Sequence, residues 1–225
     1  MPGAIPGGYF YIALQTYPFS IKSIDMYSQI NPGRARRVTL LFSLQLLCLL
    51  AGAQVKYSGT SVDLLISGTS TLHDWTMKSV KADCSANFNI SPTGQINGLN
   101  NLTFSTPVDA LKSDHTAMDN NAYKALKTDK NPVISYTLTS VTVITPAAGG
   151  ASTVTCTGKL TIAGATRQAQ VIAVCKPNND NTMTVTGSEK ISMKDFSIDP
   201  PTFMLGTIKT GNDITLSFSL ILKRA

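Results

Sequence analysis

Few side chains in this chain have the chemistry to coordinate a metal ion. His73 and His115 are its two histidines, and each neighbours an aspartate, Asp74 or Asp114. Imidazole and carboxylate groups are common zinc ligands, but the spacing of these four residues matches no metal-binding motif. We therefore expect no metal site, with His73 hydrogen-bonded at one end of the fold and His115 in solvent.

Residues that could act as a nucleophile or as an acid–base pair are also scattered. Serines are numerous, but none occurs in a Gly-x-Ser-x-Gly segment, the arrangement that exposes the nucleophile of α/β-hydrolases. Asp74 and Asp195 could work together as acid and base only if the fold joined them. We expect no catalytic residue and no cofactor, and the protein is predicted not to be an enzyme.

The stretch from 152 to 176 is typical of a β-hairpin. Even positions of its first arm are apolar or small and odd positions are threonine or lysine, which indicates a strand with one buried face. The second arm follows a short loop at 163–166. If Ala163 lies opposite Gln168, every inward residue meets an inward residue, whereas a slip of one position would set apolar side chains against polar ones.

This register would make Cys156 and Cys175 direct neighbours across the hairpin. Cα atoms in a non-hydrogen-bonded pair lie about 4.5 Å apart, which suits a disulfide. The sequence therefore predicts a Cys156–Cys175 disulfide, with two buried free thiols as the alternative. Cys84 occupies an inward position in the alternating segment from 80 to 90, and we expect it to be buried and unreactive.

Similar alternation recurs through most of the chain after residue 54 and predicts further strands. They are expected at 62–66 with a continuation at 69–77, and at 80–90, 99–106, 134–138, 182–190 and 214–222. A short helix is expected at 117–127, with Thr116 as its N-cap. Closing about eight such strands into a barrel leaves no free edge. We therefore expect an all-β, antiparallel β-barrel with one short helix; a two-sheet sandwich is the alternative.

The first 53 residues have a different character from the rest. Residues 34–37 are basic, 38–50 are apolar and 51–53 are small, which is the pattern of a signal peptide cleaved after Ala53. An uncleaved membrane anchor is the alternative. The preceding segment, 1–33, is expected to be a poorly ordered extension or to precede a true translation start at Met26.

Cleavage would leave a mature chain of residues 54–225 in the periplasm or outside the cell, where disulfides persist. The formal net charge is +6 at pH 7, and half of that excess belongs to the first 53 residues. No basic face with interleaved aromatic residues is evident, so nucleic acid is not an expected partner.

Three stretches of the mature chain resemble the YceI-like family of exported lipid-binding proteins. They are Gly68-Thr69-Ser70-Thr71-Leu72-His73-Asp74-Trp75, the helix and strand from Met118 to Tyr136, and Gly158-Lys159-Leu160-Thr161-Ile162-Ala163-Gly164. The likeness runs from about Tyr57 to Leu222. The chain departs from the family where an Arg-Asp pair is common before the helix, since it has Met118-Asp119 there, and where it has Lys194-Asp195-Phe196-Ser197.

The resemblance implies a lipocalin-like barrel that holds an amphiphilic lipid, a polyisoprenoid or an isoprenoid quinone, in its lumen. Transient contact with a membrane and a homodimer are further expectations. Large apolar side chains are the candidates for the wall or mouth of such a lumen. The candidates are Trp75, Phe88, Phe104, Leu126, Tyr136, Phe203 and Met204.

A second function from a different class is compatible with the same sequence. An exported interaction module with a filled core would bind another envelope protein through its loops. A continuous cavity distinguishes the two, because the carrier needs one and the module does not. The apolar loop at 200–205 fits either, as a lip at the mouth of a lumen or as a plug packed on the end of the barrel.

Overall fold

The fold is described from a computed structural model, which places residues 53–225. The predicted extension at 1–33 and all but the last residue of the predicted signal peptide at 34–53 lie outside the described residues. Within residues 53–225, no helix has the length and apolar character needed to cross a membrane.

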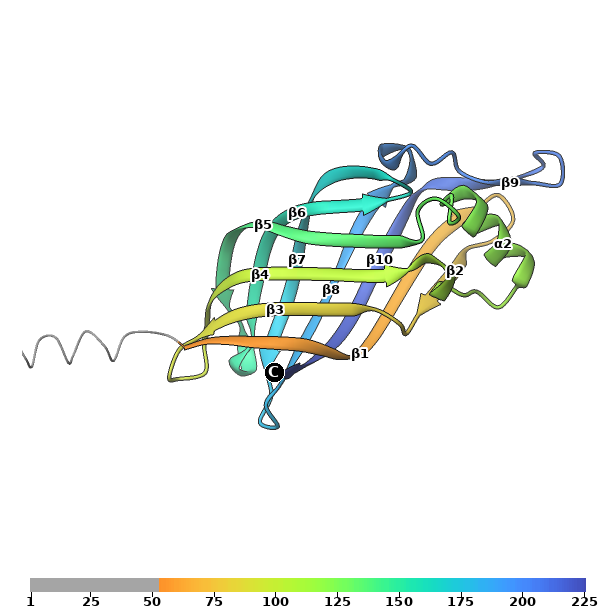
Figure 1. Cartoon of the computed structure of the whole chain (residues 1–225). Coiled ribbons are helices and arrows are strands. Elements are labelled where there is room, and N and C mark those ends of the chain that lie inside the picture. Colours follow the sequence, from red (N-terminus) through yellow and green to blue (C-terminus); the bar gives the residue numbers. More distant parts are fainter. Residues whose placement is uncertain (1–52) are drawn as a thin grey trace, which may run out of the picture. The chain divides into compact units, whose positions relative to one another are not determined.

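Eight long strands of the described chain form a closed antiparallel barrel (Figure 1). They follow the order β1, β3, β4, β5, β6, β7, β8 and β10, and pairing of β10 with β1 closes the ring. The short strand β2 pairs antiparallel with β1, and the short strand β9 pairs antiparallel with β10. The strands are β1 (Ala53–Ser70), β2 (Trp75–Ser79), β3 (Asp83–Ile90), β4 (Ile96–Pro107), β5 (Val133–Pro146), β6 (Ser152–Ile162), β7 (Ala165–Pro177), β8 (Thr182–Ser192), β9 (Thr202–Phe203) and β10 (Ile208–Arg224).

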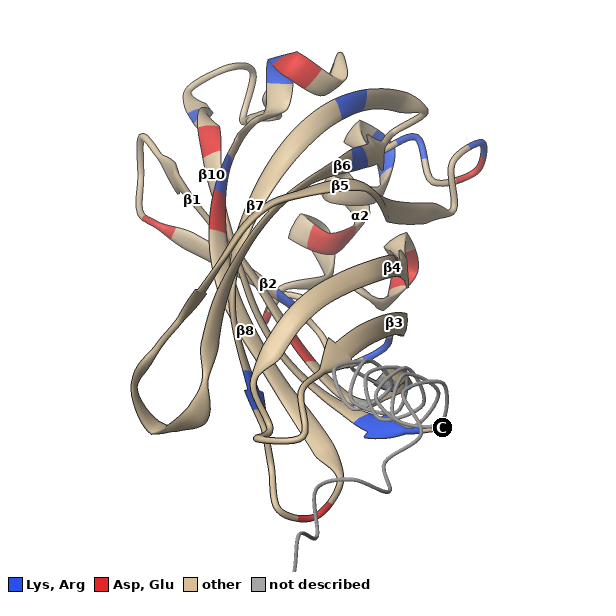
Figure 2. Ribbon diagram, turned by 90° about the vertical axis from the view of Figure 1, so that its left-hand side faces the viewer, with Lys and Arg blue, Asp and Glu red and all other residues tan. Residues whose placement is uncertain are grey.

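The barrel has two different ends (Figure 1). The helix end carries α2 (Thr116–Ala125), β2, β9 and the 3-10 turn η3 (Met193–Phe196). The far end carries the C-terminus and the links from β5 to β6 and from β7 to β8. Charged residues lie mainly in loops and on the outside, and most of the strand length is uncharged (Figure 2). The predicted antiparallel β-barrel with one short helix is therefore confirmed for the described residues.

The alternation of the sequence sets which face of each strand points inward. On β6 every even residue from Ser152 to Ile162 is buried, while the odd residues are partly or fully exposed. Side chains of successive strand residues point to opposite faces, so one set fills the barrel and the other meets solvent. The same two faces were predicted for this hairpin, and they are confirmed.

The register of the hairpin between β6 and β7 differs from the prediction by four residues. Ile162 pairs with Ala165, Cys156 with Val171, and Ser152 with Cys175. A two-residue turn, Ala163-Gly164, joins the strands with φ angles of 51° and 83°, the left-handed pair that tight hairpins favour. A slip of four is even, so it preserves the inward face, and face matching alone could not exclude it.

The corrected register removes the predicted disulfide between Cys156 and Cys175. The partner of Cys156 lies four residues from Cys175 along β7, which is about 13 Å at the usual rise per strand residue. That separation exceeds the Cα distance a disulfide can bridge. Both side chains are buried free thiols, as is Cys84, so the alternative of two buried thiols is the one found.

Three further predicted boundaries are wrong. The strand predicted to continue through 69–77 is broken by a turn at 71–74, and β2 runs back antiparallel to β1. Val80, predicted to point inward, is 75% exposed because it lies in the link between β2 and β3. The helix was expected at 117–127 with Thr116 as cap. It begins at Thr116, ends at Ala125 and has His115 at its N-cap, without a capping side-chain hydrogen bond.

Candidate lipid-binding cavity

A cavity of about 450 Å³ occupies the inside of the barrel. All eight barrel strands and α2 contribute lining residues. Cavities of a few hundred Å³ with mainly apolar walls are the usual size and character of small-molecule sites. Its lining includes no lysine, arginine or aspartate. The distinguishing feature of the carrier, a continuous cavity, is therefore present in the described chain.

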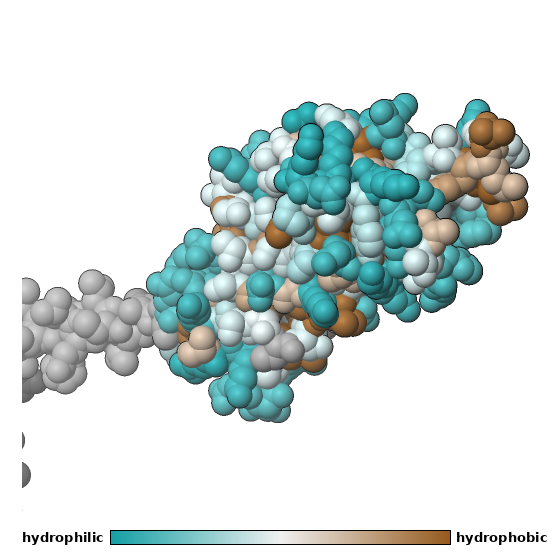
Figure 3. Space-filling view, turned by 45° about the vertical axis from the view of Figure 1, so that its right-hand side comes forward, coloured by the Kyte–Doolittle hydropathy of each residue, from teal (hydrophilic) through white to brown (hydrophobic). Residues whose placement is uncertain are grey.

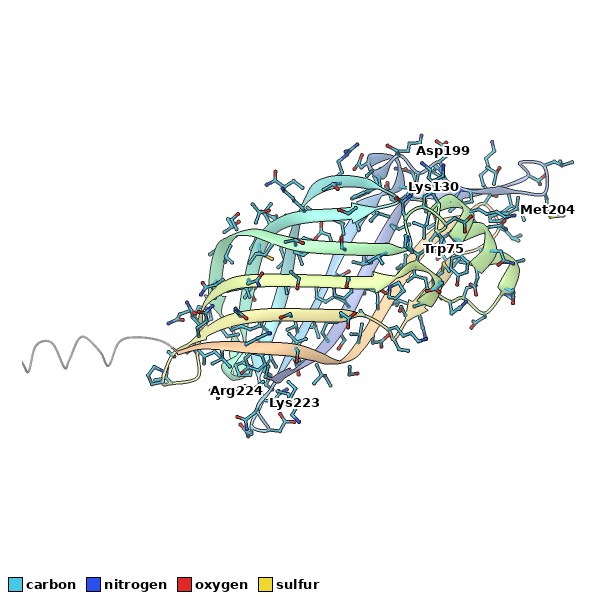
Figure 4. All side chains as sticks on the ribbon, viewed as in Figure 1. Trp75, Lys130, Asp199, Met204, Lys223 and Arg224 are labelled. Atoms are coloured by element: carbon cyan, nitrogen blue, oxygen red, sulfur yellow. The ribbon has the colours of Figure 1, made fainter. Side chains whose placement is uncertain are left out.

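Six of the seven candidate residues line this cavity. They are Trp75, Phe88, Phe104, Leu126, Tyr136 and Phe203. Met204 is not among the lining residues; its side chain is 74% exposed at the tip that follows β9. Figure 4 shows Met204 at the outer tip, well away from Trp75. That the lining residues bind a ligand stays a prediction.

Helix α2 covers part of the cavity at the helix end, with Met118, Ala122 and the C-cap residue Leu126 among the lining. Its first turn is held by Asp119, which is 6% exposed and accepts hydrogen bonds of 2.7 Å from both the backbone N–H and the hydroxyl of Ser113. Buried polar contacts of this kind hold a helix in position, because a desolvated carboxylate that moves away loses hydrogen bonds that water does not replace.

A second anchor of α2 is the hydroxyl of Tyr123. It donates to the carbonyl oxygens of Leu111 at 2.7 Å and Asp109 at 3.0 Å, and Lys112 Nζ donates to it at 2.7 Å. The ammonium group also lies 5.0 Å from the centre of the Tyr123 ring. These contacts tie α2 to the segment that follows β4, so the cover of the cavity is positioned by polar contacts from two sides.

The loop at 200–205 combines the two roles considered for it. Pro201 and Phe203 line the cavity, whereas Met204 and Leu205 are exposed at the tip. Positive φ angles at Met204, Leu205 and Gly206 turn the chain sharply back into β10. Figure 3 shows hydrophobic atoms gathered at this projecting tip. The base of the loop thus closes part of the cavity, and its tip presents apolar side chains to the exterior.

The two histidines lie at the helix end and both line the cavity edge. His73 Nδ1 is 2.7 Å from the carbonyl oxygen of Asp74, and His115 is the N-cap residue of α2. Within residues 53–225, no group of three His, Cys, Asp or Glu side chains lies close enough to hold a metal ion. Asp74 lies in the turn before β2 and Asp195 in η3.

A small set of polar groups interrupts the apolar wall. Tyr136 is 6% exposed, and its hydroxyl lies 3.6 Å from Cys156 Sγ. Burial raises the pKa of Tyr136, and the contact with Cys156 and the nearby charge of Glu189 add to this effect. Burial also raises the pKa of Cys156 and, on β8, of the lining residue Glu189. Burial thus makes each of these groups harder to ionise than it is in water.

Sequence reasoning missed Glu189 as a lining residue. The signal was available, because Met183 and Val185 mark the odd positions of this strand as inward and Glu189 continues the same series. A carboxyl group at an inward position was passed over because the search for the wall considered apolar side chains alone.

A YceI-like domain matches residues 53–222, and a comparison with curated proteins finds no match. BcnA of Burkholderia cenocepacia shares the fold with a TM-score of 0.54 at 16% identity, covering 71% of this chain and 95% of that one. A polyisoprenoid binding domain from Saccharophagus degradans gives a TM-score of 0.54 at 13% identity, covering 77% of this chain and 100% of that one. At these identities the structural likeness supports the fold. Because the matched domain extends from the first strand of the barrel into the last, the chain belongs to the YceI-like family.

Proposed function

We propose that this protein is an exported carrier that holds an amphiphilic lipid, a polyisoprenoid or isoprenoid quinone, inside its barrel. The observation that carries the proposal is the continuous apolar cavity of about 450 Å³. Transfer of a prenyl chain from water into such a cavity is favoured by about 25 cal/mol per Å² of apolar area buried, before the costs of association. The interaction module with a filled core has no use for this space.

The fold neighbour from Saccharophagus degradans, which is described as a polyisoprenoid binding domain, supports the same ligand class. The wall chemistry supports it independently. Isoprenoid chains carry branched methyl groups, and the half-buried side chains of Leu126, Ile134 and Leu216 offer irregular apolar contacts of matching size.

Export and membrane contact belong to the same proposal. The sequence pattern places signal cleavage after Ala53, so the mature chain would begin at Gln54 within the residues that form β1. Met204 and Leu205 project from the helix end, and apolar tips of this kind can enter the interfacial layer of a bilayer. N-terminal sequencing of the protein from an exported fraction should begin at Gln54; a sequence that begins earlier contradicts cleavage at this site.

Native mass spectrometry of the exported protein, followed by organic extraction, tests the carrier directly. We expect a discrete added mass that extracts as an isoprenoid-like compound. A bare mass together with no uptake of added isoprenoid quinone or prenyl lipid contradicts the proposal and favours the interaction module.

A matched pair of variants on β7 sharpens this test. Val171→Trp places a large side chain in the cavity, whereas Val174→Trp places it on the outer face, where Val174 is 42% exposed. The added mass should be lost in the first variant and kept in the second. Retention in both would mean that the bound molecule lies outside the barrel.

A further inference from the structure

Glu189 is the one acidic residue in the lining of the cavity among the described residues. It lies on β8 between the inward positions of Val185 and Ile191. Its carboxyl group makes no hydrogen bond and no ion pair with any other residue in 53–225. A carboxyl group that faces an apolar wall without a partner is unfavourable, because its lost hydration is not replaced.

The hydroxyl of Tyr136 faces the same interior and is also poorly satisfied. Its side-chain partner is Cys156 Sγ at 3.6 Å, a long contact to a weak hydrogen-bonding group. The ring lies over Gly158, where an added Cβ would come within 2.6 Å of the Tyr136 hydroxyl oxygen. The glycine therefore gives the phenol room to reach inward from β5 across β6.

These side chains form one polar group within the barrel. Cys156 pairs with Val171 on β7, and Ala173, two residues further along β7, pairs with Gly187 on β8, two residues from Glu189. Cys156 and Glu189 therefore lie at a similar height on either side of β7, and both line the cavity with Tyr136. Tyr136 pairs with Leu160, and its hydroxyl points along β6 past Gly158 towards Cys156. Cys156 is six residues from the hairpin turn, so these polar groups lie inside the barrel and not at its rim. We refer to Tyr136, Cys156 and Glu189 as the inner polar cluster.

The chemistry of this cluster selects among lipid head groups. A fatty acid or a prenyl phosphate would bring a negative charge towards Glu189, and the cavity lining offers no lysine or arginine to balance it. A hydroxyl group both donates and accepts a hydrogen bond. It can donate to the carboxylate of Glu189 while accepting from the hydroxyl of Tyr136, and so satisfies both groups at once.

We propose that the inner polar cluster receives the hydroxyl end of a neutral amphiphile, such as a prenyl alcohol or a prenylated phenol. The head group then lies inside the barrel, and the hydrocarbon chain extends towards α2 and β9 at the helix end. This inference rests on the proposed carrier function and names the head group that the carrier accepts.

Binding titrations with two probes of equal chain length test the inference. Geranylgeraniol carries a hydroxyl group and geranylgeranoic acid a carboxylate at pH 8, and Trp75, the single tryptophan of the chain, lies in the cavity lining and reports binding by its fluorescence. We expect the unaltered protein to bind the alcohol at least about tenfold more tightly than the acid. Equal affinities would overturn the head-group assignment and leave the carrier function standing.

Variants of the inner polar cluster test which of its residues cause the preference for the alcohol over the acid. Glu189→Gln should reduce the preference to about threefold or less, and Glu189→Lys should reverse it, because an ammonium group replaces the repelling carboxylate. Tyr136→Phe should weaken binding of the alcohol about three- to tenfold while leaving that of the acid unchanged. An unaltered preference in Glu189→Gln would overturn the proposal.

The control is Lys190→Gln, on the exposed outer face of the same strand, which should leave both affinities unchanged. Thermal unfolding of each variant shows whether the fold is intact. Even if both lose some stability, Glu189→Gln and Glu189→Lys should differ in their ratio of affinities for the alcohol and the acid. If neither probe changes the Trp75 fluorescence and neither co-migrates with the protein, the carrier function and the head-group assignment fail together.

Discussion

The far end and the helix end of the barrel use the same kinds of inward side chain but bury them to different extents. At the far end, Phe88, Met183 and Leu222 are at most 2% exposed, and the rings of Tyr57 and Phe88 meet edge to face with centroids 5.8 Å apart. Towards the helix end, Leu216 and Phe218 are only half-buried and line the cavity. Phe88 and Leu222 also border the cavity, but their neighbours cover them almost completely, whereas the side chains near the helix end stay partly open.

The difference shows what alternation of apolar residues does and does not determine. Leu216 and Leu222 lie on the same face of β10, three inward positions apart. Alternation places both side chains inside the barrel, but a packed core also needs side chains from opposite walls to meet. At the helix end α2 and the 200–205 loop cover the opening without filling the space beneath them.

Leucine-to-alanine substitutions at the two ends of β10 should give the largest difference in stability between the far end and the helix end. Leu222→Ala should lower the free energy of unfolding by about 3 kcal/mol, because it removes the contacts of a side chain that is 0% exposed. Leu216→Ala should cost about 1 kcal/mol, since that side chain already borders empty space. Denaturant unfolding measures both, and equal losses would mean that the two ends are packed alike.

A close contact at Gly158 predicts the next largest effect. An added Cβ would lie 2.5 Å from the carbonyl oxygen of Thr137 and against the Tyr136 ring. Gly158→Ala should therefore cost about 1–3 kcal/mol of stability and displace the phenol. Gly59→Ala is the matched control, because its Cβ would meet Cys84 at an ordinary 3.5 Å. A neutral Gly158→Ala, measured by urea unfolding, would show that the wall adjusts freely there.

The cover of the cavity should respond to loss of its buried anchor. Asp119→Ala leaves the N–H of Ser113 without its acceptor, while the hydroxyl keeps the carbonyl oxygen of His115, and should cost about 1–2 kcal/mol. It should also speed exchange of bound lipid, because α2 is held less firmly over the lumen. Asn120→Ala, on the exposed side of α2, should change neither quantity. Lipid exchange that is equally slow in both variants would show that α2 does not control access.

The buried thiols give the smallest effect and a pH dependence. Burial raises the pKa of Cys84 and of Cys175 to about 12 from an ordinary value of 9.0. The folded state therefore holds these protons more tightly than the unfolded state, so stability is full below about pH 9 and falls between about pH 9 and about pH 12. At pH 10 the loss should be on the order of 1 kcal/mol for each thiol.

Cys175→Ala separates this effect from other alkaline transitions. The difference in unfolding free energy between the variant and the unaltered protein, measured under reducing conditions, should shrink as the pH rises from 8 to 10. A constant difference would mean that the folded protein does not perturb this thiol.

Much of the fold could be predicted from the sequence, because inward and outward faces depend only on the period of the side chains. The confirmed faces of β6 and β7 show this. Register could not be predicted, since an even slip keeps the same faces and only the two-residue turn at Ala163-Gly164 decides between them. Closure through β1 and β10 depends on residues far apart in the chain, such as Leu64 and Phe218, which pair.

The candidate site, like the fold, could be predicted only in part. Large apolar residues at inward positions, such as Phe104 and Tyr136, were found because alternation marks them. Met204 was assigned to the wall or mouth because its loop is apolar, but the chain turns sharply at 204–206, where φ angles are positive, and its side chain is exposed. Glu189 was missed because its charge argues against an interior position unless the space beside it can hold a ligand.

The ladders around the barrel differ in length, and two of them are short. β8 pairs with β10 over eleven residues, from Ser192 to Thr182, but with β7 over only five, from Gly187 to Met183. Glu189 lies on the stretch of β8 beyond that short ladder. A closed ring can come apart only where two neighbours separate, and this ladder and the five-residue ladder between β4 and β5 are the shortest in the ring. Amide hydrogens of the barrel should therefore exchange soonest along these short ladders. A lipid longer than the lumen could separate the strands there.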